Sequence, residues 1–90
     1  MYDPEVLTDE QILAAVVAEI KWQDQVSTNI PRTRDEVRLA IASLQDEVRE
    51  VWEAWHLWKR QPDWSAVRDE AIQTAALAYR LARVPVGLVD

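Results

Sequence analysis

Two acidic segments hold the side chains in this sequence that could bind a metal ion. The run DEVRE contains Asp46, Glu47 and Glu50, and the run EAIQ contains Glu70 and Gln73. Glu47 and Glu50 share one side of a helix because they are three residues apart, and the pair in the second run does so too. If the two helices face each other, four oxygen-bearing side chains converge, and a hard cation such as Mg²⁺ prefers such ligands. The alternative is that both runs are ordinary solvated helix faces.

The composition narrows the kinds of function that this chain can have. Its 90 residues include ten Lys and Arg against sixteen Asp and Glu, and the net charge of -6 opposes binding to nucleic acid. There is no Cys, and His56 is the single histidine, so a zinc centre is excluded and oxygen atoms must serve as metal ligands. No apolar run approaches the ~20 residues that a membrane span needs, and no signal segment begins the chain. We therefore expect a cytoplasmic protein with no membrane partner.

Helix-start and helix-stop signals predict an all-α chain. Thr8 and Gln11 match a capping box, and Thr33 and Glu36 match another. Proline ends or separates the helical segments because it cannot continue a helix. The helices are expected over about residues 9–26, from about residue 34 to the break at Pro62, and over about residues 64–83.

The domain organisation follows from the short length. We expect residues 1–90 to form a single domain, with residues 1–8 as a flexible N-terminus and residues 84–90 as a C-terminal tail. A chain this short buries only a thin core. We therefore expect a helical bundle of three main helices whose four-helix-bundle-like core is completed by oligomerisation.

The second and third helices carry different apolar patterns. The second has a heptad stripe, which predicts packing along its whole length. The third is apolar nearly all round, as the run AIQTAALAY shows, so it is expected in the middle of the bundle. Gln73 is conspicuous there, and on its own it is most simply a structural amide that a neighbouring helix satisfies. The heptad stripe consists of Val37, Ile41, Leu44, Val48, Val51, Trp55 and Trp58.

Five tryptophans in a chain of this size are unusual, and four of them cluster at Trp52, Trp55, Trp58 and Trp64. Large aromatic side chains are enriched in the cores of interfaces, so we favour a dimer contact. A platform for stacking nucleic-acid bases is the alternative. The acidic balance of the chain argues against that alternative.

The two acidic runs together resemble the MazG-like, all-α nucleoside triphosphate pyrophosphohydrolases. The signature of that family is E-E-x-x-E followed by E-x-x-D on the next helix, and here the halves read DEVRE and EAIQ with nineteen residues between Glu50 and Glu70. The runs KWQDQ at residues 21–25 and DEAIQTAALAYRLA at residues 69–82 are also similar to the family. The likeness covers roughly residues 12–83.

The resemblance implies a fold, a reaction and a set of site residues. Such proteins are helical bundles that form dimers or tetramers and cleave nucleoside triphosphates to a monophosphate and pyrophosphate, with magnesium or manganese. Asp46 and Glu47 would be catalytic, since Asp46 would orient or deprotonate the attacking water. The implied metal ligands are Glu47, Glu50, Glu70 and Gln73, and the implied substrate-binding residues are Lys21, Trp22, Gln25 and Arg80. Trp22 could equally be a core aromatic, and Arg80 could be a plain partner for Glu70 or for a carboxylate across an interface.

The sequence departs from the family pattern at two positions. Gln73 replaces the final Asp, which removes one negative charge from the expected site, and Asp46 replaces the first Glu. Two other functions therefore remain open. The chain could bind nucleotides with weak turnover or none, or it could be a purely structural helical interaction module.

Overall fold

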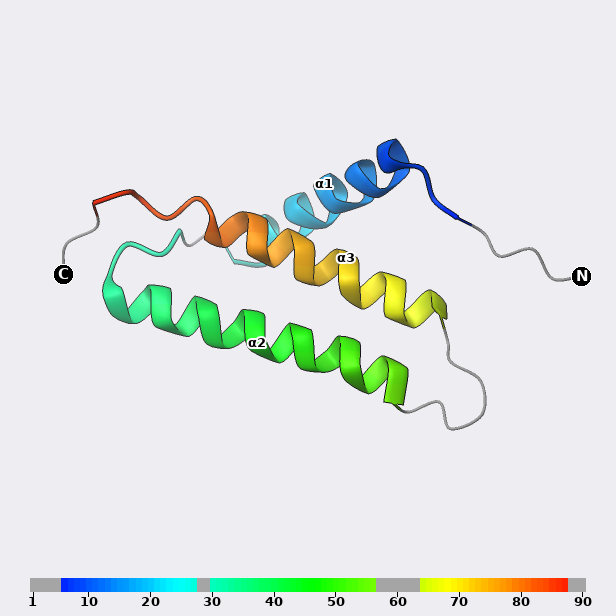
Figure 1. Cartoon of the computed structure of the whole chain (residues 1–90). Helices are drawn as coiled ribbons and strands as arrows, with labels where there is room; N and C mark the ends of the chain where they lie inside the picture. Colours follow the sequence, from blue (N-terminus) through cyan, green and yellow to red (C-terminus); the bar gives the residue numbers. More distant parts are fainter. Residues whose placement is uncertain (1–5, 28–29, 57–63, 88–90) are drawn as a thin grey trace, which may run out of the picture.

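The computed structural model describes residues 6–27, 30–56 and 64–87, and these residues form three helices (Figure 1). The helices are α1 (Asp9–Val26), α2 (Arg34–His56) and α3 (Trp64–Leu81). The described residues contain no strand, so the predicted all-α class is confirmed. Trp58 and the predicted break at Pro62 lie outside the described residues.

The helix boundaries follow from local capping. Thr8 and Gln11 form the predicted capping box, in which the Gln11 amide donates to the Thr8 hydroxyl at 3.1 Å and the Thr8 amide donates to Gln11 Oε1 at 2.8 Å. Thr33 accepts a hydrogen bond from the Glu36 amide at 3.1 Å at the start of α2.

The third helix ends two residues earlier than the expected residue 83. There the backbone tightens, because the amides of Arg83 and Val84 bond to carbonyls three residues back, on Arg80 and Leu81, each at 3.1 Å. This tightening satisfies carbonyls that the last turn of a helix leaves without intrahelical partners.

Helix α3 lies between the other two helices (Figure 1). It packs against α1 on one side and α2 on the other, whereas the described residues of α1 and α2 do not contact each other. Ala76 on α3 is completely buried, since a small side chain lets both neighbours approach closely. The central position predicted for this helix is thus confirmed. The three helices form an open layer, and completion of a bundle core by a second copy stays a prediction.

The apolar core is small. Among the described residues only Ile20, Ala54 and Ala76 are buried hydrophobics, one on each helix. The expectation that the heptad stripe of α2 packs along its whole length is wrong within the described chain, because Ile41, Val48 and Trp55 remain 44–46% exposed. The reason is that α3 covers a neighbouring stripe of α2. That inner stripe consists of Ala40, Leu44, Glu47, Val51 and Ala54.

No helix in the described parts of the chain is long and apolar enough to cross a membrane.

Candidate metal centre

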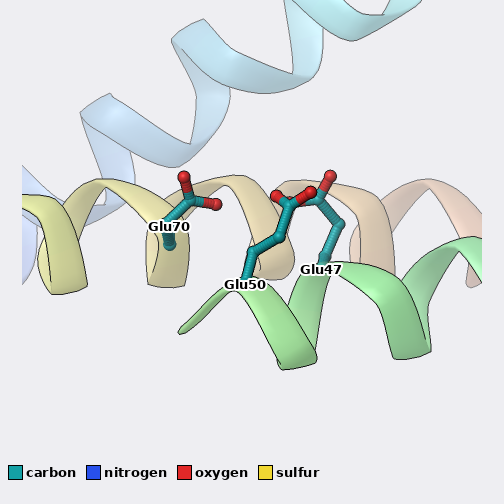
Figure 2. A group of neighbouring side chains, drawn as sticks. All are labelled: Glu47, Glu50 and Glu70. Atoms are coloured by element: carbon teal, nitrogen blue, oxygen red, sulfur yellow. The ribbon is translucent and has the colours of Figure 1, made fainter. Parts of the chain in front are cut away.

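Three carboxylates from two helices meet between α2 and α3. Glu47 and Glu50 extend from α2 toward α3, and Glu70 extends from α3 toward them (Figure 2). One oxygen atom of each side chain lies within 4.8 Å of the other two. The spacing of three residues puts both α2 carboxylates on the side that faces α3, as the sequence predicts. The structure therefore brings together three of the four expected ligands.

The environment of the cluster disfavours the charged forms of Glu47 and Glu70. Burial raises the pKa of Glu47 above its usual range, and the charges of Glu50 and Glu70 raise it further. Burial is also the largest cause of the raised pKa of Glu70, and a hydrogen bond and a charge interaction with Glu50 raise that pKa further. Glu47 Oε2 and Glu70 Oε2 are buried without any hydrogen-bond partner. Buried polar oxygens normally have a partner, so this cluster offers free acceptor capacity.

No basic side chain of the described residues neutralises the cluster. Within the described residues, no Lys or Arg forms an ion pair with Glu47, Glu50 or Glu70. The nearby Arg49 points to the outer side of α2, where it pairs with Asp46 at 3.7 Å and with Glu53 at 3.4 Å. A proton or a cation can therefore supply a compensating charge here. The oxygen-only ligands and the unpartnered oxygens Glu47 Oε2 and Glu70 Oε2 suit a hard divalent cation, which would retain several waters.

Glu19 on α1 is a fourth acidic residue near the cluster, and the sequence motifs did not reveal it. Its charge contributes to the raised pKa of Glu47. Gln23, one turn later, donates from Nε2 to Glu19 at 3.1 Å and to the backbone oxygen of Gln73 at 3.2 Å. The signal that could have identified Glu19 is its position along α1. Glu19 and Gln23 lie on either side of Ile20, which is the buried residue of this helix.

Two expected site residues lie outside the three-glutamate cluster. The Asp46 side chain is 66% exposed and is held by Arg49. Gln73 is half-buried and lines a hollow of about 400 Å³ between α1 and α3, together with Glu19 and Asp69. Its backbone oxygen accepts a hydrogen bond from Gln23 Nε2 of α1. This bond does not involve the side-chain amide, so the expectation that a neighbouring helix satisfies that amide stays a prediction. The role of its side chain as a metal ligand stays a prediction.

The three expected substrate residues on α1 are exposed. Lys21, Trp22 and Gln25 occupy the last turns of that helix, and Trp22 is 60% exposed. Trp22 is therefore not a core aromatic of the described chain. Whether these residues meet a nucleotide stays a prediction.

Arg80 joins the ends of α1 and α3. Its Nε lies 2.9 Å from Asp24 Oδ1, and its Nη2 donates to the backbone oxygen of Ser27. Arg83 binds the same carboxylate at 2.9 and 3.0 Å. Hydrogen bonds from Arg83 and Arg80 hold the pKa of Asp24 below its usual range. Arg80 thus has a carboxylate partner, but that partner is Asp24 of the same chain and not Glu70 or a carboxylate across an interface, the two partners that were expected.

Comparisons of the chain with protein-family models, with curated proteins and with solved structures found no match.

Proposed function

We propose that this chain is a metal-dependent nucleoside triphosphate pyrophosphohydrolase that acts in housekeeping of the nucleotide pool. The observation that carries the proposal is the convergence of Glu47, Glu50 and Glu70 within 4.8 Å, with no basic residue of the described chain paired to them. Two of these carboxylates have buried oxygens without partners, which supports a role in binding a cation. The similarity of both acidic runs to the MazG-like signature supports this choice of reaction.

The ion would be Mg²⁺ or Mn²⁺, and each of the three glutamates would bind it through one oxygen. When bound, such an ion neutralises phosphate oxygens and lowers the pKa of a coordinated water. Glu47 Oε2 has free acceptor capacity and a raised pKa, so it can accept a proton from a water molecule. Asp46 is the second candidate for that role, but it must first leave Arg49.

The reaction requires no redox partner. The oxygen of water forms a bond to the α-phosphorus, and the bond from that phosphorus to the bridging oxygen breaks. Pyrophosphate leaves with the bridging oxygen, and the proton of the water passes to a carboxylate. Because the chain has a net charge of -6, a triphosphate is expected to bind with its cation and not alone.

The substrate contacts are drawn from α1 and from the end of α3. Trp22 is exposed and could stack on a base, while Lys21 and Gln25 could contact a sugar or phosphate oxygen. Arg80 lines a hollow of about 360 Å³ with Ser43 and Leu77, so its guanidinium could reach a bound phosphate.

The test is an assay of pyrophosphate release with a panel of canonical and modified (deoxy)nucleoside triphosphates and Mg²⁺ or Mn²⁺. Wild-type chain should release pyrophosphate only with metal, and Glu47→Gln should abolish the release. The matched control is Glu53→Gln, on the same helix but outside the three-carboxylate cluster, which should retain it. Equal release by both variants would contradict the site assignment.

Nucleotide binding without turnover is the second candidate, and the amide at Gln73 favours it. An amide removes one charge from the site, although its oxygen can still coordinate a hard cation. This candidate predicts that metal and nucleotide together raise the melting temperature without pyrophosphate release. A purely structural module predicts neither effect.

A further inference from the structure

The hollow of about 360 Å³ between α2 and α3 lies on the same sides of these helices as the acidic cluster. On α2 it is lined by Glu36, Ala40 and Ser43. These residues precede the two glutamates of α2 at alternating steps of four and three, so they lie along one line of the helix. On α3, Leu77 and Arg80 follow the third glutamate by seven and ten residues, which also returns to one side. The cluster and the hollow therefore share one seam between the two helices.

The distances along this seam match the order of the parts of a nucleotide. Ala40 and Leu77 each lie about 10 Å along their helix from a glutamate of the cluster, at a rise of about 1.5 Å per residue. Glu36 and Arg80 lie further along, at about 15–17 Å from the same glutamates. In a nucleotide the sugar and the base follow the phosphate in line. A phosphate held with its cation at the cluster therefore places the base in the hollow.

The walls of the hollow suit a flat aromatic ring. Most of them are apolar, with a few charged or polar groups, which is the usual composition of a small-molecule site. Leu39 is 56% exposed, so a ring bound here would remove apolar surface from water. The apolar lining consists of Pro31, Leu39, Ala40, Leu77 and Leu81.

Two side chains of opposite charge lie at the far end of the hollow. The carboxylate of Glu36 has no hydrogen-bond or ion-pair partner among the described residues. Arg80 is anchored to Asp24 and Ser27 through Nε and Nη2, which leaves Nη1 without a bond to a described residue. Guanine suits both groups, because its O6 and N7 accept from an arginine and its N1–H and N2–H₂ donate to the two oxygens of a carboxylate. Cytosine and adenine present an acceptor beside their amino group, and uracil has no amino group, so none of them binds a carboxylate through two adjacent donors.

We propose that this hollow is the base subsite of the chain and that it selects guanine nucleotides, with Glu36 and Arg80 reading the base. The inference rests on the proposed function for the placement of the phosphates at the cluster. It differs from the base contacts that the MazG-like likeness suggests, because Lys21, Trp22 and Gln25 do not line the hollow. Of the two roles open to Arg80, a phosphate contact or a base contact, its distance from the cluster favours the base.

The test is the binding of GMP, AMP, CMP and UMP to the full ¹⁵N-labelled chain with Mg²⁺, followed by amide chemical shifts. All four carry the same phosphate, so a difference in affinity reports the base. GMP should shift the amides of Ala40, Ser43 and Leu77 and should bind roughly 10- to 100-fold more tightly than UMP, the range for one bidentate base contact. Equal affinity for the four bases, shifts centred on Trp22 with none at the hollow, or no binding of millimolar GMP would overturn the proposal.

Glu36→Gln should remove the preference for GMP, because the amide sets an N–H₂ group against the donors of guanine. The fold should survive, since Gln is as suitable as Glu at this position of a capping box. Asp35→Asn is the matched control. It removes a charge from the same turn but lies outside the hollow, where it pairs with Arg38, so it should keep the preference. An equal loss in both variants would contradict the role of Glu36.

A second pair of variants fills the hollow or its surroundings. Ser43→Leu should abolish the GMP shifts, whereas Ala42→Leu, on the outer side of α2, should retain them. Binding of GMP that survives in Ser43→Leu as it does in Ala42→Leu would place the base elsewhere.

Base selection and hydrolysis fail separately, because the monophosphates cannot be cleaved to pyrophosphate. Release of pyrophosphate from triphosphates without any preference for GMP would overturn the base subsite and leave the hydrolase proposal standing. Selective binding of GMP in the hollow without cleavage of any triphosphate would support the subsite and contradict the hydrolase proposal.

Discussion

Removing the central charge of the glutamate cluster should stabilise the metal-free protein. Two unit charges 4.8 Å apart repel by ~3.5 kcal/mol at an effective dielectric constant of about 20. Glu50 interacts with both Glu47 and Glu70, but the partial exposure of these side chains reduces the net effect. We expect Glu50→Gln to raise the free energy of unfolding by about 1–2 kcal/mol near pH 8. For a domain of this size each kcal/mol corresponds to about 4–8 °C in melting temperature.

The assay is thermal unfolding by circular dichroism with a chelator, at fixed protein concentration. A carboxyl whose folded pKa is raised stabilises the fold below its unfolded pKa, and that stabilisation is lost as pH rises through the folded pKa. Wild type should therefore lose stability above pH ~5 through Glu47 and Glu70, and the advantage of Glu50→Gln should vanish near pH 4. At pH 8, Mg²⁺ should raise the melting temperature of wild type above that of Glu50→Gln, because the ion stabilises wild type more than the variant. Glu53→Gln is the comparison, and it should raise the melting temperature less, because the charge of Glu53 contributes less to the raised pKa of Glu70 than Glu50 does. A Glu50→Gln variant that melts no higher than Glu53→Gln at any pH would refute the reasoning.

Three further predictions concern other parts of the molecule. Asp24→Asn should lower the melting temperature at pH 7 by releasing Arg80 and Arg83, and this difference from wild type should disappear as pH falls through the lowered pKa of Asp24. A difference that stays the same in acid that protonates the Asp24 carboxyl would count against this ion pair. Ala76→Leu should cost about 1–3 kcal/mol in a urea unfolding experiment because this buried site has no spare room, while Ala75→Leu at an exposed site should be neutral. Gln73→Asp should tighten Mn²⁺ binding in a calorimetric titration, and an unchanged affinity would mean that the side chain at position 73 lies away from the ion.

Local signals in the sequence were sufficient to predict the helices. Capping residues such as Thr8 and Thr33 act through bonds to amides three residues away, so their effect is visible in a short window. The meeting of Glu47, Glu50 and Glu70 could be anticipated from spacing and from the MazG-like likeness. The central place of α3 followed from its alanine-rich surface.

Features that depend on contacts between distant segments could not be predicted in the same way. The heptad pattern of α2 includes both Leu44, which lies in the inner stripe that α3 covers, and Val48, which α3 leaves exposed. The pattern alone therefore did not show which side of α2 faces α3. Glu19 approaches the cluster only through the packing of α1 on α3, and no motif marks it. The partner of Arg80 likewise depends on where α1 ends in space, which places Asp24 beside it.

The location of a bound paramagnetic ion would decide whether the cluster is a metal centre. Mn²⁺ titrated into ¹⁵N-labelled chain broadens amide resonances near the ion, and the order in which they disappear identifies its ligands. We predict that the amides of Glu47, Glu50 and Glu70 broaden first, followed by that of Glu19. Earlier broadening at exposed acids such as Asp35 or Glu10, or no selective broadening at all, would contradict a metal centre between α2 and α3.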